Sequence, residues 1–196
     1  MKPRVVAYVA YGQISLAVFL ALCVALHPGF VLKANEGGMS NYGIHAETAA
    51  AYTLALGLPA LFSFLAARLI TTSQGQRRRL RLLLQTYVWL LLLTLVSTYI
   101  YSFNTVLRDL HITFGSALTV FESAASIWMF VVLRRRRPDG VLLAAQILGF
   151  VVEVLTFAGL WHVLFLSEVV TSGAFAILLV RMAGSLEVAG HVDAPA

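Results

Sequence analysis

Three glutamates stand inside long apolar stretches of the sequence, where a charged side chain is costly. They are Glu122, Glu153 and Glu168, and insertion scales put the cost of such a residue in a bilayer at about 2.5–3.5 kcal/mol. Glu122 follows His111 by eleven residues, and Glu153 precedes His162 by nine. A helical rise of about 1.5 Å per residue would therefore place these two carboxyl groups at similar depths, roughly 16 and 13 Å below the same end of adjacent helices.

The three carboxyl groups allow two interpretations. In the first, they are protonated and hydrogen-bond between helices as packing contacts. In the second, they line a polar cavity that binds a cation, relays a proton or pairs with a cationic ligand. Small and polar residues accompany each glutamate at helical spacing, among them Ser126, Gln146 and Ser172. Because such stripes normally face other helices, we expect the glutamates to point into the bundle.

Four of the five histidines are expected at one end of the helices, close to Glu47 and to Asp109. They are His27, His45, His111 and His162. Imidazoles and carboxylates from different helices could hold zinc or another divalent cation with an open position for water, as a membrane-embedded, metal-dependent hydrolase would need. No pair has the fixed spacing of a motif such as HExxH. Histidines that simply lie at the membrane surface are therefore the alternative.

Several other chemistries lack the residues that they need. A haem held between two histidines needs a histidine in the middle of a span, and a retinal Schiff base needs a lysine inside the bundle, whereas the two lysines are Lys2 and Lys33. The single cysteine, Cys23, excludes a disulfide or a cysteine cluster within one chain. The sequence also has no Walker loop, no GxSxG elbow and no dinucleotide fingerprint.

The composition determines which elements must position these residues. Of the 196 residues, 60% are hydrophobic and only 12% are charged, with a mean hydropathy of +0.85, whereas soluble domains are about 45–50% apolar and about 25% charged. A soluble globule this small could not bury so much apolar surface. The chain is therefore predicted to be an integral membrane protein, and its net charge of +5 to reflect membrane topology, with no nucleic acid as a partner.

The apolar runs predict an all-α, polytopic bundle of six transmembrane helices in one domain, residues 1–184, followed by a loose cytoplasmic tail, 185–196. Each run is long enough to cross a hydrocarbon layer about 30 Å thick. The predicted spans lie near 5–26, 48–70, 80–101, 112–133, 141–160 and 165–182. The last two are separated only by a short turn around Trp161-His162, so a bundle of five spans is the alternative. Trp89 and Trp128 are expected to pack between helices, with the lining of a pocket as the alternative.

The basic residues predict the orientation. Twelve of the fourteen would lie on one side of the six-span bundle, and only Lys33 and Arg108 on the other. The excess of Lys and Arg in cytoplasmic loops then places both termini in the cytoplasm, with the plasma membrane as the expected location. The longest connection, 27–47, would lie outside, and its Pro-Gly and Gly-Gly pairs would let it fold back as a lid.

This outer connection carries a resemblance to a known family. It contains His27-Pro28-Gly29-Phe30 and, just before the second span, Ser40-Asn41-Tyr42-Gly43. With its six spans, the chain resembles the DRAM/Frag/Sfk-like group of membrane proteins and their bacterial relatives, in which a Pro-containing loop and a Ser-rich, Gly-ending motif precede the second span. The resemblance implies a lipid-associated or membrane-trafficking role without a defined catalytic mechanism.

Three functional hypotheses follow. In the first, an outward-facing polar cavity binds a lipid or small amphiphile, or the bundle is an accessory subunit of a membrane complex; membrane lipid, another membrane protein or a second copy would be the partner. The second is the metal-dependent hydrolase that uses outer histidines and glutamates. The third is a proton- or cation-coupled carrier that uses Glu122 and Glu153. The candidate ligand-binding residues are Glu122, Glu153, Glu168, Asn41, Tyr42 and Arg108.

Overall fold

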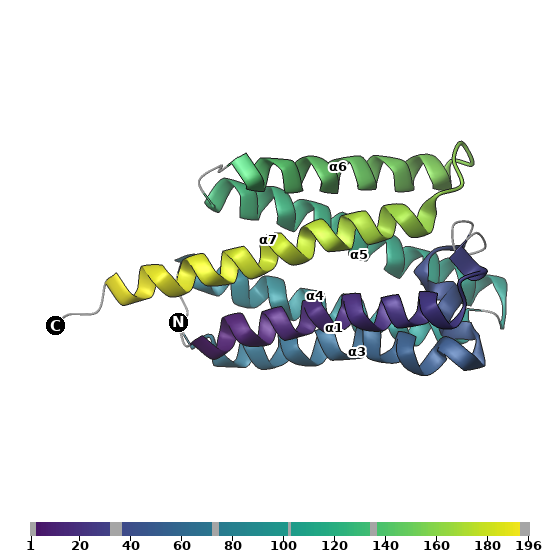
Figure 1. Ribbon diagram of the computed structural model, residues 1–196, viewed down its shortest axis with the longest axis horizontal. Coiled ribbons are helices and arrows are strands. Elements are labelled where there is room, and N and C mark those ends of the chain that lie inside the picture. The colour runs from purple at the N-terminus through teal and green to yellow at the C-terminus, as the bar shows by residue number, and fades with distance from the viewer. Residues whose placement is uncertain (1–2, 32–36, 72–74, 102, 134–136, 193–196) are drawn as a thin grey trace.

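The computed structural model describes residues 3–31, 37–71, 75–101, 103–133 and 137–192, and this part of the chain forms helices and no strand (Figure 1). The elements are α1 (Pro3–Leu26), the 3₁₀ segment η1 (Met39–Ile44), α3 (Ala46–Leu69), α4 (Gly75–Ile100), α5 (Thr105–Val132), α6 (Arg137–Phe157) and α7 (Leu164–Val192). The six α-helices are all long and apolar enough to cross a membrane. The predicted all-α class is confirmed for the described residues, and the six helices that could span a membrane agree with the six-span prediction over the five-span alternative.

The turn that separates the last two spans lies where the sequence predicted it. Helix α6 ends at Phe157 and α7 begins at Leu164, so Trp161 and His162 lie in the connection. Gly159 adopts a φ of 74°, a left-handed conformation that glycine reaches without steric cost. This residue lets the chain reverse direction within a few residues.

Several helices begin or end outside the predicted spans. Helix α5 starts at Thr105, well before the predicted boundary at 112, because the side chain of Asn104 accepts a hydrogen bond of 2.9 Å from the backbone N–H of Leu107 and so caps the helix. His111 therefore lies inside α5 and not at its end. Helix α7 continues to Val192, so the part of the predicted tail that is described is helical.

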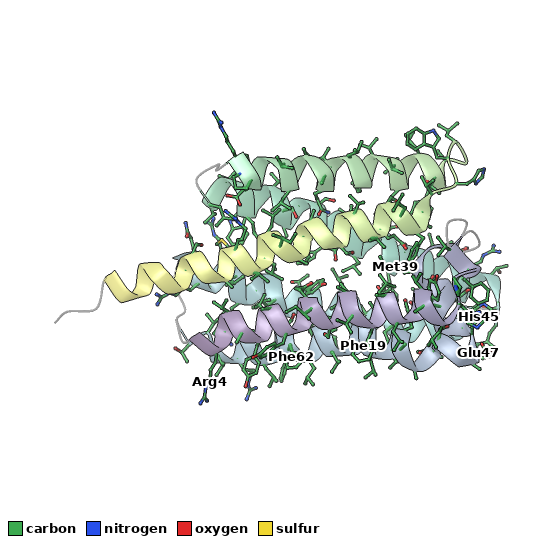
Figure 2. The ribbon with its side chains drawn as sticks, in the orientation of Figure 1. Arg4, Phe19, Met39, His45, Glu47 and Phe62 are labelled. Atoms are coloured by element: carbon green, nitrogen blue, oxygen red, sulfur yellow. The ribbon has the colours of Figure 1, made fainter. Side chains whose placement is uncertain are left out.

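The helices pack in two groups (Figure 1). Helix α3 packs on α1 and α4, whereas α6 packs on α7 and α5, and α7 also contacts α1. The start of α1 and the end of α7 lie at the same end of the bundle, here called the terminal end; the opposite end is called the η1 end. Figure 2 shows Arg4 at the terminal end and His45 with Glu47 at the η1 end. The cavity described below lies where the two groups meet.

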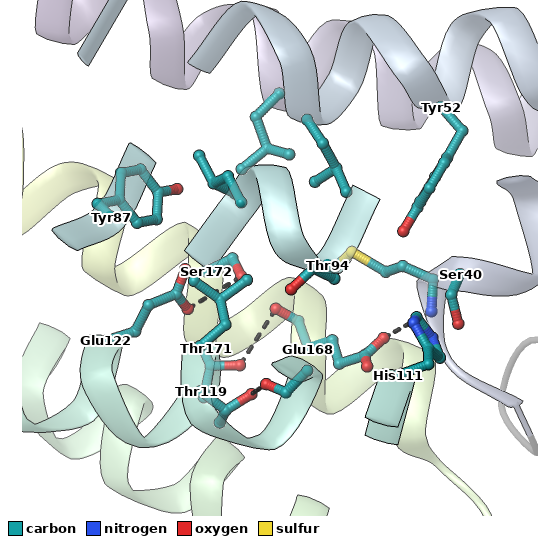
Figure 3. A pocket seen from close by; sticks show the side chains of 16 residues that line it. Ser40, Tyr52, Tyr87, Thr94, His111, Thr119, Glu122, Glu168, Thr171 and Ser172 are labelled. Carbon is teal, nitrogen blue, oxygen red and sulfur yellow. Dashed lines mark hydrogen bonds between the residues drawn. The ribbon is translucent and has the colours of Figure 1, made fainter. Parts of the chain in front are cut away.

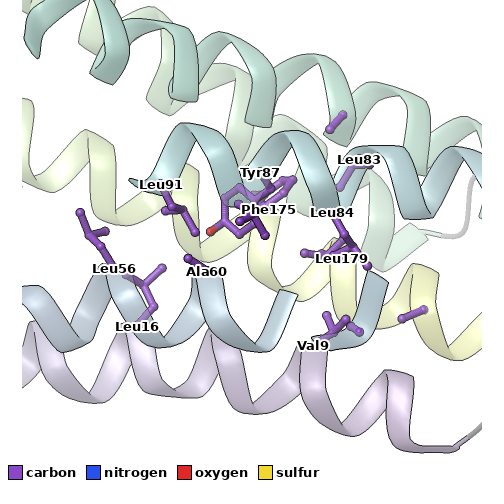
Figure 4. Close-up of a cluster of buried hydrophobic side chains, with 14 of the residues drawn as sticks. Val9, Leu16, Leu56, Ala60, Leu83, Leu84, Tyr87, Leu91, Phe175 and Leu179 are labelled. Atoms are coloured by element: carbon purple, nitrogen blue, oxygen red, sulfur yellow. The ribbon is translucent and has the colours of Figure 1, made fainter. Parts of the chain in front are cut away.

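The apolar core lies among α1, α3, α4 and α7 (Figure 4). The ring of Tyr87 packs on that of Phe175 at a centroid distance of 5.1 Å, and both side chains are fully buried. Ala55 and Ala60 of α3 are also buried, and small residues of this kind let membrane helices approach closely.

Helix α6 buries polar residues and leaves apolar ones outside. Its buried residues are Asp139, Gln146, Gly149 and Glu153, whereas Val141 and Leu148 are 70% and 64% exposed. A helix that points its polar face into the bundle suits a lipid surround, because polar groups are costly in hydrocarbon. The fold thus brings the polar stripe of α6 against α5 and α7.

One buried ion pair joins α6 and α7 near the terminal end. The Nε of Arg181 lies 2.6 Å from Oδ1 of Asp139, whose side chain is fully buried. The four arginines followed by Pro138-Asp139-Gly140 predict a short solvated turn over 134–140, and this prediction is wrong for Asp139. The reason is that α6 already begins at Arg137, which turns Asp139 toward α7; residues 134–136 lie outside the described part of the chain.

Candidate functional site

A polar cavity of about 80 Å³ lies inside the bundle, between the two helix groups and below η1. We call it the carboxyl cavity. Figure 3 shows polar side chains from α3, α4, α5 and α7 around it. Its polar lining residues are Ser40, Tyr52, Tyr87, Thr94, His111, Thr119, Glu122, Glu168, Thr171 and Ser172. No lysine or arginine of the described chain lines it.

Glu122 reaches the cavity from the middle of α5. Its side chain is only 2% exposed, and its carboxyl Oε2 accepts a hydrogen bond of 3.2 Å from the hydroxyl of Ser172 on α7. The sequence predicted that Glu122 and Glu153 would lie at similar depth. Both of them bond to α7, on the adjacent residues Ser172 and Thr171, which agrees with that prediction.

Glu153 lies behind the cavity wall, on α6. It is 3% exposed, and its Oε1 accepts a hydrogen bond of 2.7 Å from the hydroxyl of Thr171, which does line the cavity. Gly149, one turn before Glu153, makes this contact feasible. A Cβ atom at Gly149 would lie 2.8 Å from Thr171 Cγ2 and 3.2 Å from the carbonyl oxygen of Ser167, so only glycine lets α6 approach α7 so closely.

Glu168 holds η1 over the end of the cavity. Its Oε2 accepts a hydrogen bond of 2.6 Å from the backbone N–H of Met39, and Met39 and Ser40 line the cavity beside it. Gly38 has a φ of 76°, and a Cβ there would lie 2.8 Å from Glu168 Oε1. The close approach and the left-handed backbone both require glycine. Residues 37–47 of the predicted lid, 27–47, therefore do fold back over the bundle; residues 32–36 lie outside the described part of the chain.

Thr94 of α4 adds a hydroxyl without a partner. Thr94 is 8% exposed, and its Oγ1 has no hydrogen-bond partner among the described residues. Figure 3 shows it beside Glu168, on the opposite wall of the cavity. A buried hydroxyl without a hydrogen bond costs about 1–3 kcal/mol. The cavity thus holds a polar group that a bound ion or molecule could satisfy.

His111 lies at the same end of the cavity as Glu168. Its Nδ1 is 2.9 Å from the hydroxyl oxygen of Ser97, and its ring stacks on Tyr101 with centroids 5.0 Å apart. Since His111 lines the cavity, it belongs with the glutamates. The sequence grouped it instead with the other three histidines.

Those other histidines lie elsewhere. His27 and His45 are at the η1 end with Phe30 between them; Phe30 stacks on His45 at 4.1 Å, and His27 Nε2 lies 3.3 Å from Oε2 of Glu47. His162 is exposed in the α6–α7 connection. Among the residues that the structure describes, no three His, Cys, Asp or Glu side chains are grouped so that they could hold a metal ion. The four histidines of the predicted zinc site do not come together.

The remaining candidates lie outside the cavity. Tyr42 is fully buried in η1, where its ring contacts Phe165 with centroids 5.8 Å apart, and burial raises the pKa of its hydroxyl. Asn41 is half-buried beside it, and its backbone N–H donates to Gly38 O. Arg108 is exposed and lies 3.8 Å from Asp109. None of the three lines the carboxyl cavity.

The residues that α4 contributes to the cavity are not among those predicted from the sequence. Tyr87, Thr94 and Thr98 are all buried and are spaced so that they fall on one face of a helix. This spacing is a readable signal inside an otherwise apolar run. It could have indicated that α4 faces the glutamates.

Comparison with known proteins does not add a relative. No family model matches the chain, and neither the curated proteins nor the solved structures give a significant match.

Proposed function

We propose that the protein is a carrier in which a proton or a small cation, bound in the carboxyl cavity, is coupled to transport. The observation that carries the proposal is the convergence of three glutamates from three helices. Glu122 and Glu153 bond to consecutive hydroxyl residues of α7, and Glu168 lies one turn before them on the same helix.

The charges around the cavity favour a positively charged ligand. Charged groups inside a membrane normally pair with one another or mark the path of an ion or proton. The described residues that line the cavity include two carboxyl groups and no lysine or arginine. A bound cation or proton would therefore supply the positive charge that these carboxylates need as a partner.

The size of the cavity limits the ligand. Its volume of about 80 Å³ corresponds to only a few waters, since one water occupies roughly 30 Å³ in the liquid. A small cation with part of its hydration shell would fit, and a phospholipid would not. The volume thus favours the carrier hypothesis over a lipid or amphiphile in this cavity.

We also propose that the protein lies in the plasma membrane. In this arrangement the η1 end faces outside and both termini lie in the cytoplasm. Support comes from the arginines, because Arg4, Arg68, Arg137 and Arg181 all belong to helix segments near the terminal end. Arginine is enriched on the cytoplasmic side of membrane proteins. In this orientation η1 would cover the outer entrance to the cavity.

Charge movement in proteoliposomes tests the carrier. The purified protein is reconstituted, and currents are recorded after steps of pH, Na⁺ or K⁺ concentration. Glu122→Gln and Glu153→Gln are expected to reduce the current about tenfold or more, because an amide can neither take up and release a proton nor give a bound cation a negative partner, and a hydrogen bond to a charged group is worth about 1.5–3 kcal/mol. Asp109→Asn, at an exposed carboxylate outside the cavity, is the matched control and should leave the current unchanged.

Two results would contradict the proposal. One is a wild-type protein that is folded and correctly inserted but gives no current under any of the three gradients. The other is a triple variant, Glu122→Gln, Glu153→Gln and Glu168→Gln, that melts like the wild type and keeps its current. The second result would leave the glutamates as packing contacts.

A further inference from the structure

A second hollow lies on the outer surface of the bundle, between α3 and α4. It has a volume of about 610 Å³ and is open along its length. We call it the α3–α4 groove. Residues that line it include Gly57, Leu61 and Phe64 from α3, and Gln85, Trp89 and Leu92 from α4. It is separate from the carboxyl cavity, with which it shares no lining residue.

The groove exists because a small residue lies between large exposed ones. A Cβ atom at Gly57 would meet no other atom within 4 Å, whereas Trp89 is 66% exposed and Phe64 is 46% exposed. Trp89 therefore lines a hollow, which is the second of the two places predicted for it, and does not pack between helices. In a bilayer an open apolar trough of this kind would receive a hydrocarbon chain.

Both walls of the groove continue into arginines toward the terminal end. On α3, Arg68 follows Phe64 by one turn, and its Cζ lies 5.7 Å from the centre of the Phe64 ring. On α4, Arg81 precedes Gln85 by one turn and Arg78 lies nearly one turn before Arg81. Residues three or four apart share a helix face. Because α3 and α4 pack together and run in opposite directions, these arginines fall at the same end of the groove.

The three arginines have no acidic partner in the described part of the chain. The ion pairs found there involve His27, Arg108 and Arg181 only. Arg68 and Arg78 are exposed, and Arg81 is half-buried. Three cations at the end of an apolar groove are complementary to an anionic group at the surface of the membrane.

Gln85 fits the same arrangement. It lines the groove one turn inside Arg81, which is about 6 Å deeper along the helix. The headgroup and interfacial layer on each side of a bilayer is several ångströms thick. The Gln85 amide would therefore lie near the ester groups of a phospholipid, where an amide can donate a hydrogen bond.

We infer that the α3–α4 groove binds a phospholipid with an anionic headgroup, whose phosphate lies among Arg68, Arg78 and Arg81 and whose acyl chain lies along Trp89 and Gly57. The apolar volume, the polar residue at ester depth and the unpaired arginines at one end are three features that one phospholipid molecule satisfies together. The site does not depend on the proposed carrier function.

Bromolipid quenching of tryptophan fluorescence tests this site. The protein is reconstituted in phosphatidylcholine vesicles that contain phosphatidylglycerol brominated in its acyl chain, or the same fraction of brominated phosphatidylcholine. The difference between the wild type and Trp89→Phe isolates the signal of Trp89. Brominated phosphatidylglycerol is expected to quench this signal more strongly, and high salt to reduce the preference by screening.

Two sets of variants separate the headgroup from the acyl chain. The double variant Arg68→Gln and Arg81→Gln should lower the preference for phosphatidylglycerol about tenfold or more, since each arginine near anionic lipid contributes about a factor of five. Arg4→Gln, also at the terminal end, is the matched control. Gly57→Phe should fill the groove and remove the quenching by both lipids, whereas Gly173→Phe, at an exposed position on α7, should not.

The inference is overturned if Trp89 is quenched equally by the two lipids in the wild type, or if the double arginine variant keeps the preference. It is also overturned if Trp89 becomes shielded from both lipids as the protein density in the vesicles rises, because a second copy of the chain would then occupy the groove. Melting of each variant in detergent, compared with the wild type, identifies any that fail to fold; Arg68→Gln alone then replaces the double variant.

Discussion

Two aspartates of the chain have very different surroundings. Asp139 is fully buried and lies 2.6 Å from Arg181, whereas Asp109 is largely exposed and lies 3.8 Å from Arg108. Removing one partner of a buried pair leaves the other charge uncompensated, which typically costs about 3–5 kcal/mol. An exposed pair contributes about 0–1 kcal/mol. The two pairs thus allow a direct comparison within one chain.

We predict that Asp139→Asn destabilises the protein by about 1–3 kcal/mol, because the guanidinium of Arg181, whose side chain is 35% exposed, loses its carboxylate between α6 and α7. Asp109→Asn is the control and should change stability by less than about 1 kcal/mol. Thermal unfolding in detergent measures both. Equal melting temperatures for the two variants would show that the buried pair does not stabilise the bundle.

At the scale of the elements, the apolar runs were sufficient to predict six helices, but not how each helix is rotated. Hydrophobicity is nearly uniform around most of these spans, because lipid accepts apolar side chains on every outer face. The inward direction of Glu122 and Glu153 could be predicted from their cost in lipid. Their bonds to α7 could not, because they depend on how the helices approach each other, as Glu153 depends on the close approach at Gly149.

We predict that Gly149→Leu separates α6 from α7 and breaks the hydrogen bond between Glu153 and Thr171. Overpacking of a closely packed contact usually costs about 1–3 kcal/mol. Gly173→Leu is the matched control, because a Cβ at Gly173 meets nothing within 4 Å. Melting temperature and the proteoliposome current would be measured together. If both variants behave like the wild type, α6 does not depend on this contact.

For the whole molecule, the two helix groups meet along two contacts, since α5 packs on α4 and α7 packs on α1. The cavity therefore lies on the boundary between two bodies and not within one. Composition and spacing predicted a membrane bundle, and the structure confirms six candidate spans. The four histidines do not form one group, because only His27 and His45 lie together, whereas His111 lines the cavity and His162 is exposed in the α6–α7 connection. The resemblance to DRAM/Frag/Sfk-like proteins stays a prediction.

We predict the orientation from the arginines of the terminal end, and site-directed labelling measures it. Ala46→Cys at the η1 end should react with a membrane-impermeant maleimide in intact cells, whereas Ser185→Cys should react only after permeabilisation; both positions are exposed. The parent chain is the control, because its single cysteine, Cys23, is fully buried and should stay unlabelled. Labelling of Ser185→Cys in intact cells would show that the orientation is the opposite of the one predicted.

The hydrogen bond that seats η1 has a consequence for protein engineering. Glu168 accepts this hydrogen bond from the main-chain N–H at position 39, not from a side chain. Every amino acid except proline carries that N–H group. Position 39 can therefore be exchanged for a fluorinated or spin-labelled residue with the anchoring contact retained. A reporter side chain placed there would respond to what enters the carboxyl cavity, while the hydrogen bond that holds η1 is retained.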